Sequence, residues 1–126
     1  MRYSFSVPWT EKAQEIAKAL EFDHIPIERI ACVESSGTKT RRVIARIHTL
    51  GKVMQLGMQH KPCYVIELIT EQFGRQSPED QTKTIIHELL HIPHSFGGGF
   101  RHHKPYVNKK TVEIEFKRLQ NAAFEF

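Results

Sequence analysis

Two histidines and a glutamate in the second half of the chain have the spacing of a metal-dependent hydrolytic site. His87, Glu88 and His91 form the pattern His-Glu-x-x-His. In a helix, residues four apart lie one turn apart on the same face, so both imidazoles can bind a single ion. Glu88 lies beside that face, where its carboxylate can take a proton from water at the ion. The spacing predicts His87 and His91 as metal ligands and Glu88 as the catalytic base.

The flanking residues predict that this motif is helical. Ser77 can serve as the N-cap, Pro78 suits the first helical position, and two acids follow in the first turn. Pro93 ends the helix just beyond His91. Away from the histidines runs an apolar stripe of Ile85, Ile86, Leu89 and Leu90. The alternative is a surface helix that carries two histidines by chance.

The motif continues into a longer pattern over residues 84–103. After His-Glu-Leu-Leu-His-Ile-Pro comes a short gap, then Phe96, the glycines 97–99 and, at the end, His103. This stretch resembles the small phage-type metallopeptidases of archaea, of their viruses and of phages, which belong to the zincin class. The resemblance implies a zinc-dependent hydrolase that cleaves peptide bonds, without specifying the substrate.

A catalytic zinc usually has three protein ligands and one open position for water, so a third ligand is required. The resemblance indicates His103, and the glycines 97–99 would let the chain turn back toward the ion. The metzincin pattern of a glycine and a histidine after the motif fails, because His94 and Gly97 hold those positions. The open alternatives for the third ligand are His102, His94 and a glutamate of the last helix, Glu113 or Glu115.

Three further side chains near His103 are candidates for stabilising an oxyanion or for supporting the ligands: Tyr106, Arg101 and His102. In the architecture that the resemblance implies, the motif helix packs beneath a sheet, and the peptide substrate adds to a sheet edge. Residues 63–69 are too apolar for an exposed edge. The more polar segment 52–60 is better suited to that role.

Apolar periodicity predicts a helix at each end of the chain. Residues 10–21 form an amphipathic pattern, with Thr10 as the expected N-cap. Asn108 can cap a last helix, whose apolar positions at helical spacing are Val112, Phe116, Leu119 and Ala123. Residues 112–116 also alternate as a strand would, but the helical spacing continues past them.

Between these helices the pattern favours strands. Strands are predicted at residues 27–33, 42–48 and 63–69, from β-branched content or alternation. Gly51 and Gly57 break the next segment, and we interpret residues 52–58 as a strand or an extended loop. The expected fold class is α+β: a minimal zincin-like domain with a small mixed sheet, an N-terminal helix, the motif helix and a C-terminal helix. One such domain is expected to cover residues 1–126.

Composition is that of an ordinary globular protein. Of the 126 residues, 40% are apolar and 25% are charged. We find no signal peptide at the N-terminus and no apolar run long enough to span a membrane. The two cysteines, Cys32 and Cys63, are expected to be reduced thiols of a cytoplasmic protein, with a disulfide between neighbouring strands as the alternative.

The chain is mildly basic, with a net charge of +4. Its cationic clusters lie around residues 39–42, 109–110 and 117–118, and no aromatic residues are interleaved with them. A solvated surface explains such dispersed charge better than a nucleic-acid interface does. Two other functions stay open: a binding module with a structural zinc, closed by His102 and His103 together, and a basic protein associated with nucleic acid.

Overall fold

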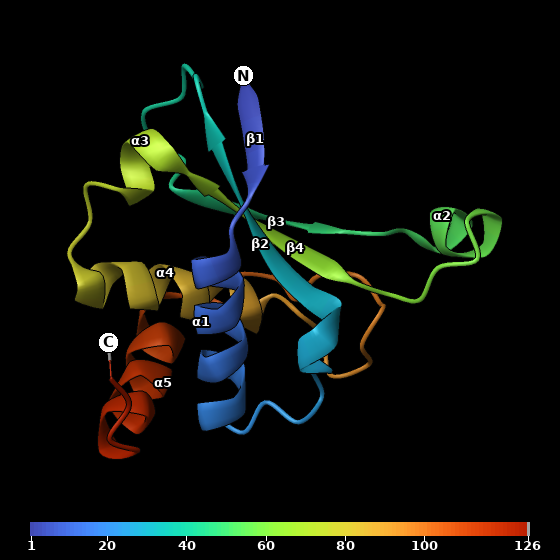
Figure 1. Cartoon of the computed structure of the whole chain (residues 1–126). Helices are drawn as coiled ribbons and strands as arrows, with labels where there is room; N and C mark the ends of the chain where they lie inside the picture. The colour runs from blue at the N-terminus through green and yellow to red at the C-terminus, as the bar shows by residue number, and fades with distance from the viewer. Residues whose placement is uncertain (126) are drawn as a thin grey trace.

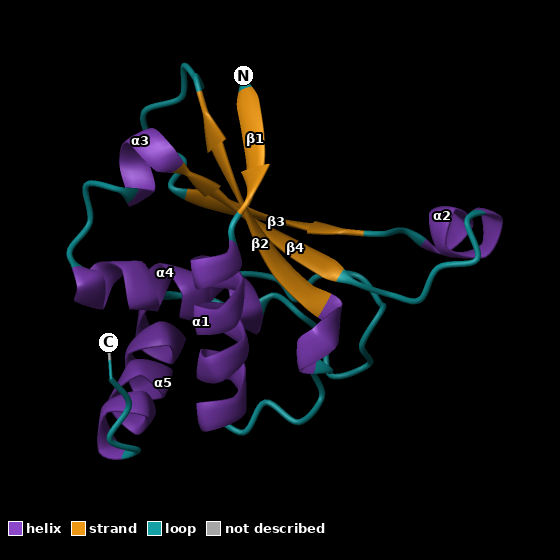
Figure 2. Ribbon diagram, viewed as in Figure 1, coloured by secondary structure: helices purple, strands orange, loops and turns teal. Residues whose placement is uncertain are grey.

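A four-stranded mixed sheet forms the centre of the computed structural model, which describes residues 1–125 (Figures 1 and 2). The strands lie in the order β1-β2-β4-β3. The outer pairs, β1 with β2 and β3 with β4, are antiparallel, and the central pair β2 with β4 is parallel. The strand bounds are β1 (Arg2–Phe5), β2 (Ile30–Ser36), β3 (Ala45–Thr49) and β4 (Tyr64–Ile69).

Three long helices lie together below the sheet in the view of Figure 1. They are α1 (Val7–Ala19), α4 (Pro78–Leu90) and α5 (Lys109–Asn121). The alternate residues Tyr64, Ile66 and Leu68 of β4 pack with the apolar stripes of these helices in one core. The shorter helices are α2 (Lys52–Gly57), α3 (Thr70–Phe73) and a 3₁₀ turn (Ile27–Arg29). The α+β class and the small mixed sheet are confirmed.

The N-terminal helix begins earlier than the sequence pattern predicts. Its N-cap is Ser6, whose hydroxyl accepts a hydrogen bond from the amide of Trp9 over 3.2 Å. Thr10, the predicted cap, is buried inside the helix instead. Its hydroxyl accepts a hydrogen bond from the Cys32 amide over 2.8 Å, and so links α1 to β2. The signal for this start was Ser6 followed by Pro8, and Trp9, which packs against the core, extends the apolar stripe by one turn toward it.

The strand predictions are right in part. Residues 63–69 correspond to β4, which is interior to the sheet as their apolar character predicts. The predicted strand 27–33 begins with the 3₁₀ turn, and β2 extends instead to Ser36. The predicted strand 42–48 is regular from Ala45 to Thr49. Strand β1 was not predicted. Both cysteines are free in this structure.

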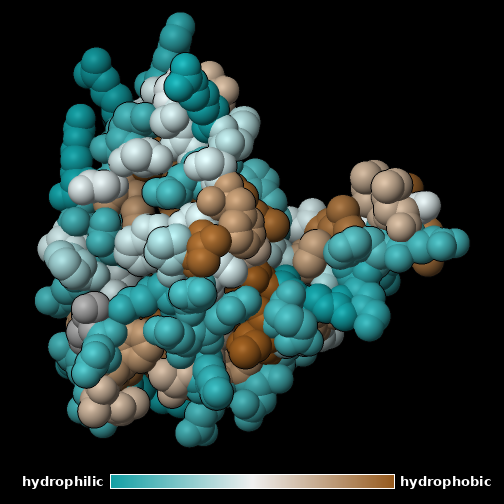
Figure 3. Space-filling view, viewed as in Figure 1, coloured by the Kyte–Doolittle hydropathy of each residue, from teal (hydrophilic) through white to brown (hydrophobic). Residues whose placement is uncertain are grey.

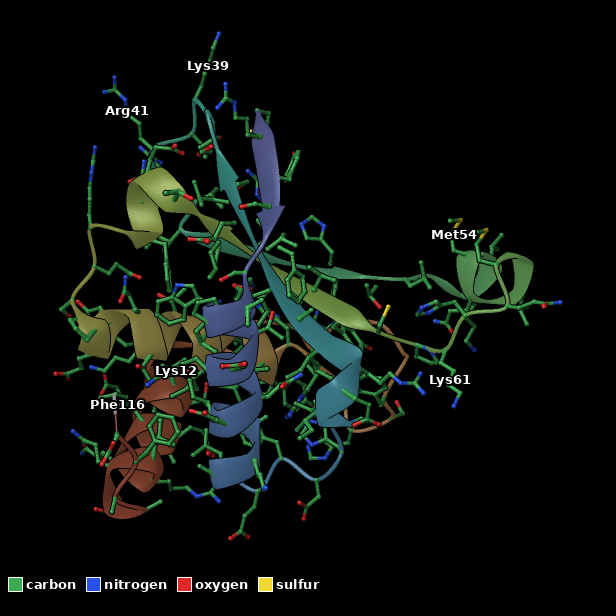
Figure 4. All side chains as sticks on the ribbon, in the orientation of Figure 1. Lys12, Lys39, Arg41, Met54, Lys61 and Phe116 are labelled. Atoms are coloured by element: carbon green, nitrogen blue, oxygen red, sulfur yellow. The ribbon has the colours of Figure 1, made fainter. Side chains whose placement is uncertain are left out.

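The prediction for residues 52–60, an extended segment at a sheet edge, was wrong. Residues 52–57 form α2, at the end of an arm that projects from the body beyond β3 and β4 (Figures 1 and 3). Its apolar side chains are among the most exposed of the chain: Val53 84%, Leu56 80%, Met58 69% and Met54 53%. Figure 4 shows Met54 and Lys61 on this arm. The edge strands are β1 and β3.

On the face of the sheet opposite α1, α4 and α5, the carboxylate of Glu67 in β4 is buried. Ser35 donates to it over 2.6 Å, and the His48 ring lies 2.8 Å from it. Burial would raise the pKa of Glu67, but these hydrogen bonds and the nearby Arg46 charge hold that pKa below its usual value. His48 is therefore a partner of this carboxylate. None of the helices formed by residues 1–125 has the length and apolarity that a membrane crossing needs.

Candidate metal centre

Helix α4 carries the first part of the site and starts as its sequence predicts. The hydroxyl of Ser77 accepts a hydrogen bond from the amide of Asp80 over 3.1 Å, and Pro78 opens the helix. The helix ends at Leu90, with His91 as its C-cap, just before Pro93. Its apolar stripe is turned into the core, with Ile85, Ile86 and Leu89 fully buried. The opposite side of α4 therefore presents His87 and His91.

Two hydrogen bonds join the end of α4 to the segment that returns after the glycines. The amide of Arg101 donates to the carbonyl of His91 over 2.8 Å. The Nδ1 atom of His91 lies 2.8 Å from the Arg101 carbonyl. Because a carbonyl only accepts, Nδ1 carries the proton, and Nε2 keeps its lone pair for another partner. A backbone partner of this kind is typical of a histidine that binds a metal.

The glycine turn between these parts is held by Tyr64, the first residue of β4. Its hydroxyl donates to the carbonyl of Gly98 over 2.7 Å and accepts from the amide of Gly97 over 3.1 Å. Gly97 has φ +100°, which a residue with a side chain rarely adopts. The sequence analysis missed this role of Tyr64. The available signal was a phenol in an otherwise apolar strand, because a buried tyrosine usually has a hydrogen-bond partner.

Substituting Tyr64 by phenylalanine removes both hydrogen bonds and deprives two partly buried backbone groups of this partner. We expect the free energy of unfolding of the metal-free protein to fall by about 1–3 kcal/mol. We expect metal affinity to fall by about tenfold, because the turn that leads to the predicted ligand His103 is loosened. Urea denaturation in the presence of a chelator and competition with a zinc indicator measure the two effects.

Tyr3→Phe is the matched control, because Tyr3 is 64% exposed and lies on β1. It should leave both quantities unchanged. Unaltered zinc affinity in Tyr64→Phe would show that the turn does not determine the position of the ligand.

Three histidines meet where the returning segment reaches α4. The ligand atoms of His87, His91 and His103 all lie within 4.8 Å of one another. The ring centroids are 5.2 Å apart for His87 and His91, 5.5 Å for His87 and His103, and 4.7 Å for His91 and His103. Among residues 1–125, these three histidines are the cluster of side chains that could hold a metal ion.

The alternative ligands have other places in the structure. His102 is not part of the three-histidine cluster, and the ring of His94 stacks on that of His24 at 4.4 Å. Glu113 is bound by Lys83 over 2.7 Å, and Glu115 by Arg118 over 2.6 Å. The structure thus brings His103, and none of these alternatives, to the two histidines of the motif.

The protonation of the cluster suits a cation. Burial, followed by the neighbouring His91 and His103, lowers the pKa of His87 to about 4. Burial also lowers the pKa of His91. These imidazoles are therefore neutral near pH 7, in the form that binds metals. Ligands about 2.1 Å from a tetrahedral zinc lie roughly 3.4 Å apart, so small side-chain rotations would bring three nitrogens to that spacing.

Glu88 lies on α4 next to this cluster and is buried, with 7% of its surface exposed. Burial raises the pKa of its carboxyl to about 7. Such a group can both accept and release a proton near neutral pH. Its position beside His87 in the chain and its burial are those expected of a base in this motif.

A cleft of about 1210 Å³ contains the cluster. It is lined by residues 42–47, which include the first half of edge strand β3, and by α4, the start of α5 and residues 100–103. Glu88, Arg101 and His102 line it, whereas Tyr106 does not. The ring of Tyr106 instead supports the guanidinium of Arg101 at 4.2 Å. The edge beside the site is thus β3, and not the segment 52–60 that was predicted.

Comparison with known proteins gives one match. A family model described as "Putative phage metallopeptidase" matches residues 3–118. No curated protein and no solved structure matches the chain. The matched range contains the three histidines, Glu88, strands β2, β3 and β4, and most of β1 and α5.

Proposed function

Because the chain belongs to this family of putative phage metallopeptidases, we propose that it is a zinc-dependent peptidase with Glu88 as its general base. Membership of the family supports a metal ion and a protein or peptide substrate. The observation that carries the proposal is the convergence of His87, His91 and His103, whose ligand atoms lie within 4.8 Å of one another. A set of three imidazoles suits zinc best among the common ions.

Each residue of the site has a defined part in this mechanism. His87, His91 and His103 hold the zinc, which when bound supplies a Lewis acid that activates water and polarises the scissile carbonyl. Glu88 takes a proton from the attacking water and passes it to the leaving amine. The Arg101 side chain, supported by the ring of Tyr106, and the ring of His102 are available at the cleft for the developing oxyanion.

The peptide would lie along β3. This strand is at the edge of the sheet and pairs with β4 on one side, so its other backbone groups face away from the sheet. An extended peptide can pair with such an edge. Because residues 44–47 line the cleft, a peptide placed there passes the histidine cluster and Glu88.

A structural zinc site is the main alternative. Structural zinc is almost always closed by four protein ligands, whereas catalytic zinc keeps one position open. Within residues 1–125, the cluster contains three histidine side chains, and His102 is not among them. This count favours the peptidase.

The proposal is tested by removing and restoring the metal. We expect purified protein to contain one equivalent of zinc and to cleave an unstructured protein such as casein. A chelator should abolish cleavage, and added zinc should restore it. Elemental analysis and gel electrophoresis measure both quantities. Stoichiometric zinc without cleavage of any unfolded protein would support the structural alternative.

A further inference from the structure

The cleft has more cationic than anionic side chains on its walls. Five cations line it: Arg42, Arg46, Lys83, Arg101 and Lys109. Three carboxylates line it: Asp80, Glu88 and Glu113. Which of these charges a ligand would meet depends on which of them already form ion pairs within the protein.

Two of the cations are neutralised by carboxylates. Lys83 lies 2.7 Å from Glu113 and 3.4 Å from Glu79. The guanidinium of Arg46 lies 3.8 Å from Glu67. Of the carboxylates, Glu113 is paired with Lys83, and Glu88 is buried. Lys83, Arg46, Glu113 and Glu88 therefore contribute little net charge to the open part of the cleft.

The remaining charges are predominantly positive. Within the part of the chain that the structure describes, Arg42, Arg101 and Lys109 form no ion pair. Arg42 and Lys109 are exposed, and Arg101 is half-buried above the ring of Tyr106. Asp80, in the first turn of α4, is the exposed carboxylate of the cleft that remains unpaired. Three unpaired cations thus face one unpaired anion.

Lys109 also stands where its own helix disfavours it. It is the first residue of α5, a helix of 13 residues whose first turn has no acidic side chain. The exposed amides at a helix start carry partial positive charge and attract anions. A cation at that position is unfavourable for folding. The charge of Glu113 on the same helix offsets it in part, but that carboxylate is bound by Lys83. Arg42 lies just before β3, so a peptide paired with that edge would pass it.

We propose that the cleft selects peptide segments with acidic side chains, which pair with Arg42 and Lys109 while the peptide lies along β3. This inference rests on the proposed peptidase function and deepens it by naming the substrate class. The apolar wall formed by Ile47 and Phe100 accepts a neighbouring side chain of the same peptide. Asp80 is the charge on the cleft that opposes the selection.

The test measures binding and cleavage with a matched pair of peptides. The probes are a short fluorescein-labelled peptide that contains glutamates and its twin with glutamine at the same positions. Anisotropy with zinc-loaded Glu88→Gln protein measures affinity without turnover, and the wild-type protein measures kcat/KM. We expect the glutamate peptide to bind about fivefold more tightly at low salt, since exposed ion pairs give effects of this size. High salt should reduce that ratio.

Two double variants with the same change in net charge locate the selectivity. Arg42→Gln/Lys109→Gln should reduce the preference to about twofold or less. Lys39→Gln/Lys110→Gln is the control, because both lysines are exposed and do not line the cleft. Figure 4 shows Lys39 projecting away from the body of the protein. The control should keep the full preference.

Each outcome decides the inference. Equal affinity for the two peptides, or a preference that survives in Arg42→Gln/Lys109→Gln, would overturn it. Tighter binding of a single-stranded oligonucleotide of equal net charge, lost in the same variant, would also overturn it and assign the surface to nucleic acid. If neither peptide is cleaved but the charge preference in binding holds, the peptidase proposal fails and the selectivity of the cleft stands.

Discussion

Replacement of Glu88 by glutamine is expected to abolish peptide cleavage and to leave the metal content unchanged. Glutamine has nearly the same shape as glutamate but cannot accept the proton of the attacking water. General base catalysis contributes roughly 10²–10⁴-fold to a rate, so kcat should fall by that factor. The histidines remain in place, because Glu88 is not part of the three-histidine cluster. Cleavage of a quenched fluorescent peptide and elemental analysis measure both effects.

Glu79→Gln is the matched control for this variant. Glu79 belongs to the same helix, its side chain is 58% exposed, and it does not line the cleft. Its removal should leave kcat within about twofold of the wild type, as is usual for exposed positions. A Glu88→Gln protein with full activity would remove Glu88 from the mechanism, whatever its metal content.

Loss of the metal is the expected result of His103→Ala. This substitution leaves two of the three imidazoles that meet at the cluster. Loss of a residue that merely supports a ligand weakens metal binding by about 10–100-fold, so loss of a ligand should exceed about 100-fold. Zinc content after dialysis and competition with a zinc indicator measure the affinity. Peptide cleavage should fall together with the zinc content.

The neighbouring histidine provides the control. His102 lies next to His103 in the chain and lines the same cleft, but it is outside the three-histidine cluster. His102→Ala should therefore retain zinc, although its activity can fall if the ring contacts the oxyanion. Normal zinc stoichiometry in His103→Ala, with loss in His102→Ala, would exchange the roles of the two residues.

The site could be predicted from sequence where its determinants are local. Ser77 and Pro78 start α4, Pro93 ends it, and a helix alone places His87 one turn from His91. His103 required the resemblance to a family, because its place depends on contacts that are distant in the chain. Tyr64 holds the turn at Gly97 from 33 residues away, and no spacing rule encodes such a contact.

The fold was hardest to predict where a strand or helix has no buried side chain. Strand β1 has only four residues, and all four are exposed, so the alternation of Arg2, Tyr3, Ser4 and Phe5 reflects no burial in the core. No residue of α2 is buried, and glycines at residues 51 and 57 interrupt its sequence. The charge balance of the cleft also could not be predicted from the sequence. The cations at residues 39–42 appeared as one cluster in the sequence, whereas only Arg42 of that group lines the cleft.

Helix α2 also affects how the protein behaves in concentrated solution. Val53, Met54, Leu56 and Met58 are in water at the end of a projecting arm, so two molecules can bring them together without any collision between their bodies. Sulfate strengthens contacts between apolar groups. Salting-out should therefore aggregate the protein through these arms first, and the clefts that contain the three histidines would stay accessible within the precipitate.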